Sequence, residues 1–212
     1  MMNLSQSIKL IIGSISITVS SIVSADVFQG KGGLVIMEAE STKSSLDKWK
    51  KKTDVKDYTG ESHIEFSGNK PANGPAISPL KYNFKVDKEG QYDLMIRGYK
   101  RLEGEERDKC NDVYVKLEGD FESAGKVPIE LLKKETKFFG GHHKKWGWAL
   151  KLDDKHKKYT PSYKFKIGET YTLTVYGRSQ RFNIDRIIFK HVSVSVEDAQ
   201  DTKLKESLMS NR

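Results

Sequence analysis

The chain has 212 residues, 36% of them hydrophobic, which is enough to build the core of one domain of ordinary size. Its 37 Lys and Arg residues against 29 Asp and Glu residues give a net charge of +8, which favours an anionic partner or simply keeps the protein soluble. Because Cys110 is the only cysteine, a disulfide within the chain is excluded, and we expect a buried, unreactive thiol.

The N-terminal residues have the pattern of an export signal. Lys9 supplies a positive charge, an apolar stretch follows over residues 10–23, and Val23-Ser24-Ala25 offers the small side chains that a signal peptidase recognises. The apolar stretch is shorter than the ~20 residues that cross a membrane as a helix. We therefore expect residues 1–25 to be a signal peptide. The mature protein is then secreted or periplasmic, with no membrane insertion and with nucleic acid an unlikely partner.

The mature chain alternates between apolar and polar residues with a period of two, which predicts strands. The expected strands cover residues 36–40, 81–86, 91–96, 112–117, 148–152, 163–167, 171–175 and 184–189. Glycine-containing turns such as Lys88-Glu89-Gly90 separate them, and only residues 127–134 favour a helical turn. The pattern predicts an all-β fold of antiparallel sheets, a sandwich or a jelly roll, as a single domain. We place this domain at residues 26–195, followed by a polar, frayed C-terminal tail at 196–212.

Two irregular segments interrupt the strands. Residues 100–111 are densely charged, and residues 125–145 end in Gly140-Gly141-His142-His143-Lys144-Lys145 before Trp146. Loops at one end of a sandwich often carry recognition while the sheets hold them rigid, although a solvated surface loop is the alternative.

Three motifs, in this order, resemble the family 6 and family 35 carbohydrate-binding modules. The first is Glu38-Ala39-Glu40 at the end of an apolar strand, and the second is Tyr58-Thr59-Gly60-Glu61 before a strand. The third is Asn183-Ile184-Asp185, preceded by the hairpin motif Gly168-Glu169-Thr170-Tyr171-Thr172-Leu173. The resemblance covers residues 33–192 and implies a jelly-roll β-sandwich that binds carbohydrate and contains a structural calcium ion.

The resemblance implies that Glu38, Glu40 and Asp185 are the calcium ligands. Side chains two residues apart on a strand project from the same face, so the two glutamates could share a hard cation. Without the resemblance, the alternative is that these glutamates face solvent or pair with Lys and Arg.

The resemblance also implies a sugar site in a cleft between loops. Tyr58 and Trp148 match its aromatic pair and Asn183 its hydrogen-bonding asparagine. Trp146 is a second candidate for the aromatic platform, the more so if Trp148 packs with Leu150 and Leu152 in the core. Apolar sugar faces stack on aromatic rings, and the hydroxyls need polar partners at the rim.

Basic residues gather around these candidates. Lys144 and Lys145 flank Trp146 together with His142 and His143, and Arg178 and Arg181 lie on the turn before Asn183. This arrangement favours a polysaccharide or oligosaccharide ligand that is anionic, either sulfated or uronic.

No catalytic constellation stands out. The two histidines lack partners at zinc-binding spacings, and there is no Gly-x-Ser-x-Gly motif. We therefore predict a non-catalytic, monomeric binding protein. A small polysaccharide-degrading β-sandwich enzyme and a protein-binding surface scaffold are the alternatives.

Overall fold

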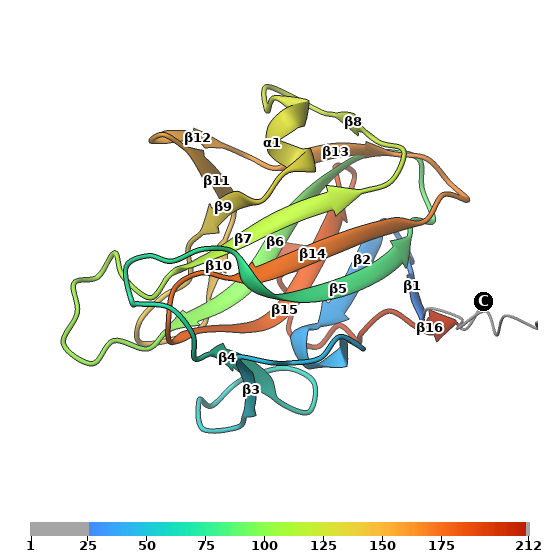
Figure 1. Cartoon of the computed structure of the whole chain (residues 1–212). Helices are drawn as coiled ribbons and strands as arrows, with labels where there is room; N and C mark the ends of the chain where they lie inside the picture. Colours follow the sequence, from blue (N-terminus) through green and yellow to red (C-terminus); the bar gives the residue numbers. More distant parts are fainter. Residues whose placement is uncertain (1–25, 211–212) are drawn as a thin grey trace, which may run out of the picture.

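The computed structural model describes residues 26–210, which form two β-sheets packed face to face (Figure 1). The predicted signal peptide lies outside the described residues. Sheet A has the strand order β12-β11-β9-β7-β14-β5-β1-β16. Its strands are β1 (Val27–Gln29), β5 (Ile77–Lys85), β7 (Asp112–Glu118), β9 (Thr136–Phe139), β11 (Lys151–Asp154), β12 (Lys157–Tyr159), β14 (Tyr171–Gly177) and β16 (Met209–Ser210). All neighbours in this sheet are antiparallel except β1 and β5.

Sheet B is fully antiparallel and has the order β3-β4-β15-β6-β13-β8, with β2 also paired to β15 and β10 to β6. Its strands are β2 (Leu34–Glu38), β3 (Trp49–Lys52), β4 (His63–Phe66), β6 (Gly90–Lys100), β8 (Glu122–Ser123), β10 (Gly147–Ala149), β13 (Ser162–Phe165) and β15 (Phe182–His191). Sheet B carries the candidate site described below.

Helix is scarce in the described part of the chain. It comprises the 3-10 helix η1 (Ala39–Ser41) and the short helices α1 (Ile129–Lys133) and α2 (Val196–Ala199). The helical turn predicted within 127–134 is α1. Among residues 26–210, no helix is both long and apolar enough to cross a membrane.

The topology is that of a jelly roll. The chain passes from β4 in sheet B to β5 in sheet A, back to β6 and over again to β7. It later returns from β13 through β14 to β15, so that the last long strand lies between β4 and β6. The predicted all-β, antiparallel jelly-roll sandwich is therefore confirmed.

The core lies between the sheets and is rich in aromatic side chains. Phe84 of sheet A stacks on Phe189 of sheet B with ring centroids 4.4 Å apart, and Phe165 lies 4.3 Å from Tyr171. The outward Lys81 of β5 is exposed and the outward Asn83 and Lys85 are half-buried, while the positions between them are buried, as the alternation predicts. Burial of these large rings replaces the disulfides that the chain lacks, because each ring removes a large apolar area from water. Cys110 is buried, as expected.

The run that the alternation assigned to one strand at 148–152 is two strands in different sheets. Trp148 lies in β10, which pairs with β6 in sheet B, whereas Leu152 lies in β11, which pairs with β9 in sheet A. The chain changes sheets at Leu150. Leu152 therefore points into the main core, while Trp148 and Leu150 pack on the opposite, outer face of sheet B.

The end of the chain is folded, in contrast to the frayed tail that we expected. Residues 194–208, called the C-terminal strap below, lie on the outer face of sheet B. Its side chains Val194, Ala199 and Leu204 complete an apolar cluster with the sheet residues Ile36, Met95, Ile188, Leu34, Trp148 and Leu150. Met95 and Ile188 occupy positions that the alternation assigns to solvent, and the strap covers them.

Hydrogen bonds fasten the strap to β2. Ser207 N donates to Ile36 O at 2.9 Å, and Ile36 N donates to Ser207 Oγ at 2.9 Å. Glu206 accepts from Glu38 N at 2.7 Å and from Ser41 Oγ at 3.0 Å. These bonds fix the strap in one position relative to the sheet.

We predict that Leu204→Ala lowers the free energy of unfolding by about 1–2 kcal/mol, because it removes a half-buried side chain from the strap cluster. The matched control is Val196→Ala in the same strap, because Val196 is 51% exposed. Urea denaturation of both variants measures the difference. Equal stability of the two variants would show that the strap cluster contributes nothing to the fold.

Candidate functional site

Two adjacent pockets lie on the outer face of sheet B. The first, called the aromatic pocket, has a volume of about 380 Å³ and is lined by Trp146, Tyr99, Arg97, Arg101, Asp54, Val55, Lys56, Asp57, Lys144 and Lys145. The second, called the arginine pocket, has a volume of about 610 Å³ and is lined by Glu38, Asp57, Tyr58, Thr59, Gly60, Arg97, Arg186, Thr202, Leu204, Lys205 and Glu206. Asp57 and Arg97 belong to both.

Trp146 is held on several sides in the aromatic pocket. Its indole Nε1 donates to Lys56 O at 2.8 Å, and its ring lies 5.3 Å from the His63 ring and 5.7 Å from the Tyr99 ring. The guanidinium of Arg97 lies 5.3 Å from the ring centroid, at cation–π distance. Trp146 is still partly exposed, so it presents aromatic surface while its position is fixed.

His63 supports this aromatic arrangement from inside. Its side chain is fully buried, and its ring lies 6.0 Å from the Tyr58 ring, so it connects Tyr58 with Trp146. Burial lowers the pKa of His63 and favours its neutral form, although Asp54 lies 3.3 Å from Nε2 and acts in the opposite direction. His63 is therefore a packing element between two aromatic rings.

The floor of the arginine pocket is a row of side chains across three strands. Arg97 of β6 is in register with Arg186 of β15, which is in register with Glu38 of β2. A shift in the β15–β6 register between Ile184 and Arg186 leaves Asp185 outside the ladder. The bulge allows Asp185 to meet Arg97, because it interrupts the strict alternation of faces.

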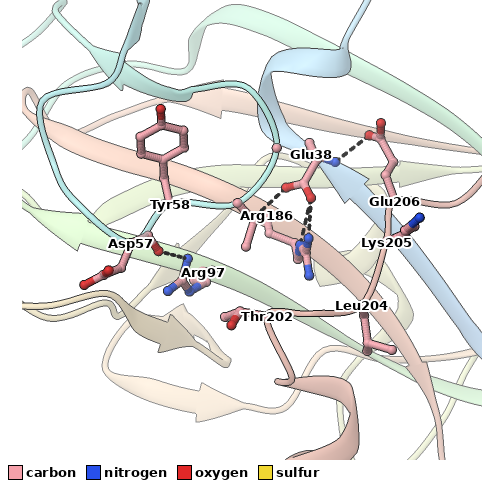
Figure 2. Close-up of a pocket in the computed structure, with 11 residues that line it drawn as sticks. Glu38, Asp57, Tyr58, Arg97, Arg186, Thr202, Leu204, Lys205 and Glu206 are labelled. Atoms are coloured by element: carbon pink, nitrogen blue, oxygen red, sulfur yellow. Dashed lines mark hydrogen bonds and ion pairs between the residues drawn. The ribbon is translucent and has the colours of Figure 1, made fainter.

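Ion pairs and one threonine connect this row. Arg186 forms an ion pair with Glu38 through two nitrogens, Nη2 and Nε, and the Nε distance to Glu38 Oε1 is 3.0 Å. Arg97 Nη1 lies 2.6 Å from Asp185 Oδ2 and forms the second ion pair. Thr59 Oγ1 lies 2.7 Å from Glu38 Oε2 and 2.9 Å from Asp185 Oδ2, and its amide donates to Asp185 Oδ1 at 2.9 Å. Figure 2 shows Arg97 and Arg186 between the loop residues Asp57 and Tyr58 and the C-terminal strap.

The predicted calcium ligands do not fit a shared cation. All four carboxylate oxygens of Glu38 and Asp185 accept hydrogen bonds from the protein, and a buried arginine balances each charge. A calcium site needs several carboxylate oxygens free to coordinate the ion. Within residues 26–210, no group of three or more His, Cys, Asp or Glu side chains is placed to hold a metal. For Glu38, the structure instead shows the alternative that the sequence left open, pairing with arginine.

Glu40 serves the neighbouring loop. Its Oε1 accepts from Glu61 N at 2.8 Å and from Ser62 N at 3.0 Å, while Oε2 is buried without a hydrogen-bond partner among the described residues. Burial raises the pKa of this carboxyl. Gly60, at φ +67°, leaves room for Glu40, since a Cβ there would lie 2.4 Å from its Oε1. The Glu38-Ala39-Glu40 motif thus fastens the loop that carries Tyr58.

The predicted sugar-binding residues separate in the structure. Tyr58 and Trp146 lie on the two sides of His63 and line the adjacent pockets. Trp148 packs in the strap cluster, so of the two tryptophans only Trp146 lines a pocket. Asn183 is fully buried, and its amide donates to Tyr99 O and Arg181 O, so this side chain cannot reach a ligand. The expectation that Asn183 contacts a ligand is corrected because its side chain is completely covered, although it lies on the same face of sheet B as its register partners Tyr99 and Glu65.

The predicted basic residues divide in the same way. Lys144 and Lys145 line the aromatic pocket, and His142 and His143, stacked 4.9 Å apart, lie on the same loop outside it. Arg178 pairs with Asp112, and Arg181 pairs with Glu103 and Glu105 of the charged loop. These two arginines hold loops together at the end of the sandwich and do not line either pocket.

Several residues of the site were not predicted from the sequence. Arg97 and Tyr99 sit at outward positions of β6, and this run of Arg and Tyr on a strand face was the available signal. Arg101 lines the pocket and pairs with Glu65 at 2.5 Å. Thr202 and Lys205 come from the strap, for which the sequence gives no signal.

No protein-family model matches the chain, and no curated protein matches it. Among solved structures, the chain is similar to the C-terminal family 6 carbohydrate-binding module of a marine laminarinase from Zobellia galactanivorans. The two are 17% identical in sequence and superpose with a TM-score of 0.43, and the match covers 74% of this chain and 99% of the module. The family 35 module from Paenibacillus barcinonensis gives 19% identity, coverage of 74% and 98%, and a TM-score of 0.41.

A mannanase from Podospora anserina that includes a family 35 module gives 14% identity and a TM-score of 0.49. The structural match covers 76% of this chain but only 28% of the mannanase. The expected resemblance to modules of families 6 and 35 is thus found in the comparison of structures.

We predict that Arg186→Met lowers the free energy of unfolding by roughly 3–5 kcal/mol, because it leaves Glu38 buried without its ion partner. Arg107→Met, at an exposed position, is the matched control and should have little effect.

Addition of a calcium chelator should leave the melting temperature of the unmodified protein unchanged. A melting temperature that falls with chelator and recovers with calcium would contradict the structural assignment.

Proposed function

We propose that this protein is a non-catalytic carbohydrate-binding protein that holds a sugar ring against Trp146. The observation that carries the proposal is the fixed but partly exposed indole at the wall of a pocket. A pyranose has apolar C–H faces that stack on such a ring. Because the indole is fixed before a ligand arrives, little conformational entropy is lost on binding.

The rim of the aromatic pocket offers polar partners for sugar hydroxyls. Arg97 uses only Nη1 in its hydrogen bonds to other described residues, to Asp57 O and to Asp185. Its remaining N–H groups are not among the buried unpartnered atoms, so they are available to a ligand. Asp57 and Lys56 add an acceptor and a donor at the same rim.

Most carboxylates around the pockets are engaged by other groups, which favours binding over hydrolysis, and Asp57 is the exposed exception. Glu38 and Asp185 are locked by arginines, and Asp54 is paired with Arg101. An acid and a base for glycoside cleavage must face the scissile bond from opposite sides at a defined separation. The charged loop offers Glu103 and Glu105, but both pair with Arg181 and neither lines a pocket.

We further propose that the ligand is anionic, with sulfate or uronate groups. Lys144, Lys145 and Lys56 surround Trp146 together with Arg97 and Arg101. Arginine and lysine make charge-assisted hydrogen bonds with such groups. Only two acidic side chains, Asp54 and Asp57, are among the residues that line this pocket. Export through the predicted signal peptide would bring the protein into contact with extracellular polysaccharides.

We predict that Trp146→Ala weakens binding to the polysaccharide that the unmodified protein retains best, by about 30-fold, which corresponds to roughly 2 kcal/mol. The polysaccharide is identified first by affinity electrophoresis in a panel of neutral, uronic and sulfated polysaccharides. The unchanged melting temperature of the variant is the control for folding. Full retention of binding by Trp146→Ala would place the site elsewhere, and release of reducing ends would show an enzyme.

We predict that the double variant Lys144→Gln/Lys145→Gln weakens binding to the anionic member of a matched pair and not to the neutral member. Suitable pairs are dextran sulfate with dextran, and polygalacturonate with its methyl ester. Binding to the anionic member should also weaken with salt, because the Debye length falls from ~10 Å at 0.1 M to ~3 Å at 1 M.

The matched control for this prediction is Lys164→Gln/Lys166→Gln, which changes two exposed lysines of the same chain outside both pockets. It should leave the preference for the anionic polymer unchanged. Equal binding of both members of each pair at all salt concentrations would rule out the anionic ligand.

A further inference from the structure

The two pockets are adjacent and share two lining residues. Arg97 and Asp57 line both, and the Arg97 guanidinium lies over the Trp146 ring on the side of the aromatic pocket. Arg97 is anchored by Asp185 and by Asp57 O, so it does not swing to open or close the connection. Each pocket has a volume within the range of ~300–1,000 Å³ that is typical of small-molecule sites.

The C-terminal strap forms one wall of the arginine pocket, opposite the loop that carries Tyr58 (Figure 2). This wall is rigid, because Leu204 packs in the strap cluster and Glu206 is bonded to Glu38 N and Ser41 Oγ. Covering the apolar cluster requires only the apolar side chains of the strap, yet the strap also places polar side chains at the arginine pocket.

Two polar strap residues, Thr202 and Lys205, line the pocket and are exposed. Neither makes a side-chain hydrogen bond or an ion pair with another described residue, in contrast to their neighbour Glu206. They therefore offer one hydroxyl and three N–H donors to whatever occupies the pocket.

We propose that the aromatic and arginine pockets form one continuous groove that binds a linear oligosaccharide. One sugar unit stacks on Trp146, the chain crosses Arg97, and the following unit lies between Tyr58 and the strap residues Thr202 and Lys205. This inference rests on the proposed function and adds to it a second subsite and the two strap residues that select for chain length.

The test uses the polysaccharide that is retained best in the panel described above. It is partially hydrolysed and separated into mono- to hexasaccharides, and binding of each length to the unmodified protein is measured by isothermal titration calorimetry. Affinity should rise by about ten-fold or more between the monosaccharide and the longer oligosaccharides. The double variant Thr202→Ala/Lys205→Ala should lose most of this gain, roughly ten-fold for the tetrasaccharide, and keep the affinity for the monosaccharide.

Lys203→Ala is the matched control, because Lys203 is exposed in the same strap but does not line the pocket. It should bind every length like the unmodified protein. Affinity that does not depend on length, or a double variant that behaves like Lys203→Ala, would overturn the second subsite and leave the proposed function intact. If no polysaccharide is retained, or if Trp146→Ala has no effect, the proposed function fails and this inference fails with it.

Discussion

The structure around the site depends on two buried ion pairs that share one threonine. Glu38 is neutralised by Arg186 and Asp185 by Arg97, and the hydroxyl of Thr59 lies between the two carboxylates. A buried carboxylate without such partners would be strongly destabilising. The pairs therefore determine where four parts of the molecule meet: the end of β2, the loop that carries Tyr58, strand β6 and the middle of β15. Both pockets are built on this junction.

The same junction fixes the loop next to both pockets through protein groups alone. Thr59 is fixed by Asp185, and Glu40 binds two successive amides at Glu61 and Ser62. These anchors hold the loop directly after Asp57 and Tyr58, and the next residues enter β4, where His63 packs against Trp146. A chain of bonded groups thus runs from the first motif of the sequence to the aromatic platform.

Alternation was sufficient to predict long strands such as β5, because Tyr82 and Phe84 lie on one face and Lys81 on the other. It did not predict β9, which lies within the segment expected to be irregular, or the change of sheet at Leu150. The site was harder to predict, because its members depend on pairing between distant strands. The bulge at Asp185 brings that residue and Arg186 into one hydrogen-bond network, and no local sequence pattern predicts a bulge at this position. Asn183 lies two residues earlier on the same strand and faces the site side of sheet B, but other groups cover it completely, which its place in the motif does not reveal.

The strap shows why a polar chain end is difficult to interpret from sequence. Its apolar residues Val194, Ala199 and Leu204 are too widely spaced to suggest an element, yet together they cover Met95 and Ile188 on a face that alternation assigns to solvent. Ordering such a segment costs conformational entropy, which its apolar contacts and its bonds to β2 must offset. Because these contacts lie beneath the strap, Thr202 and Lys205 are left on its exposed side at the edge of the groove. The packing that holds the strap in place is thus also what orients these two polar side chains.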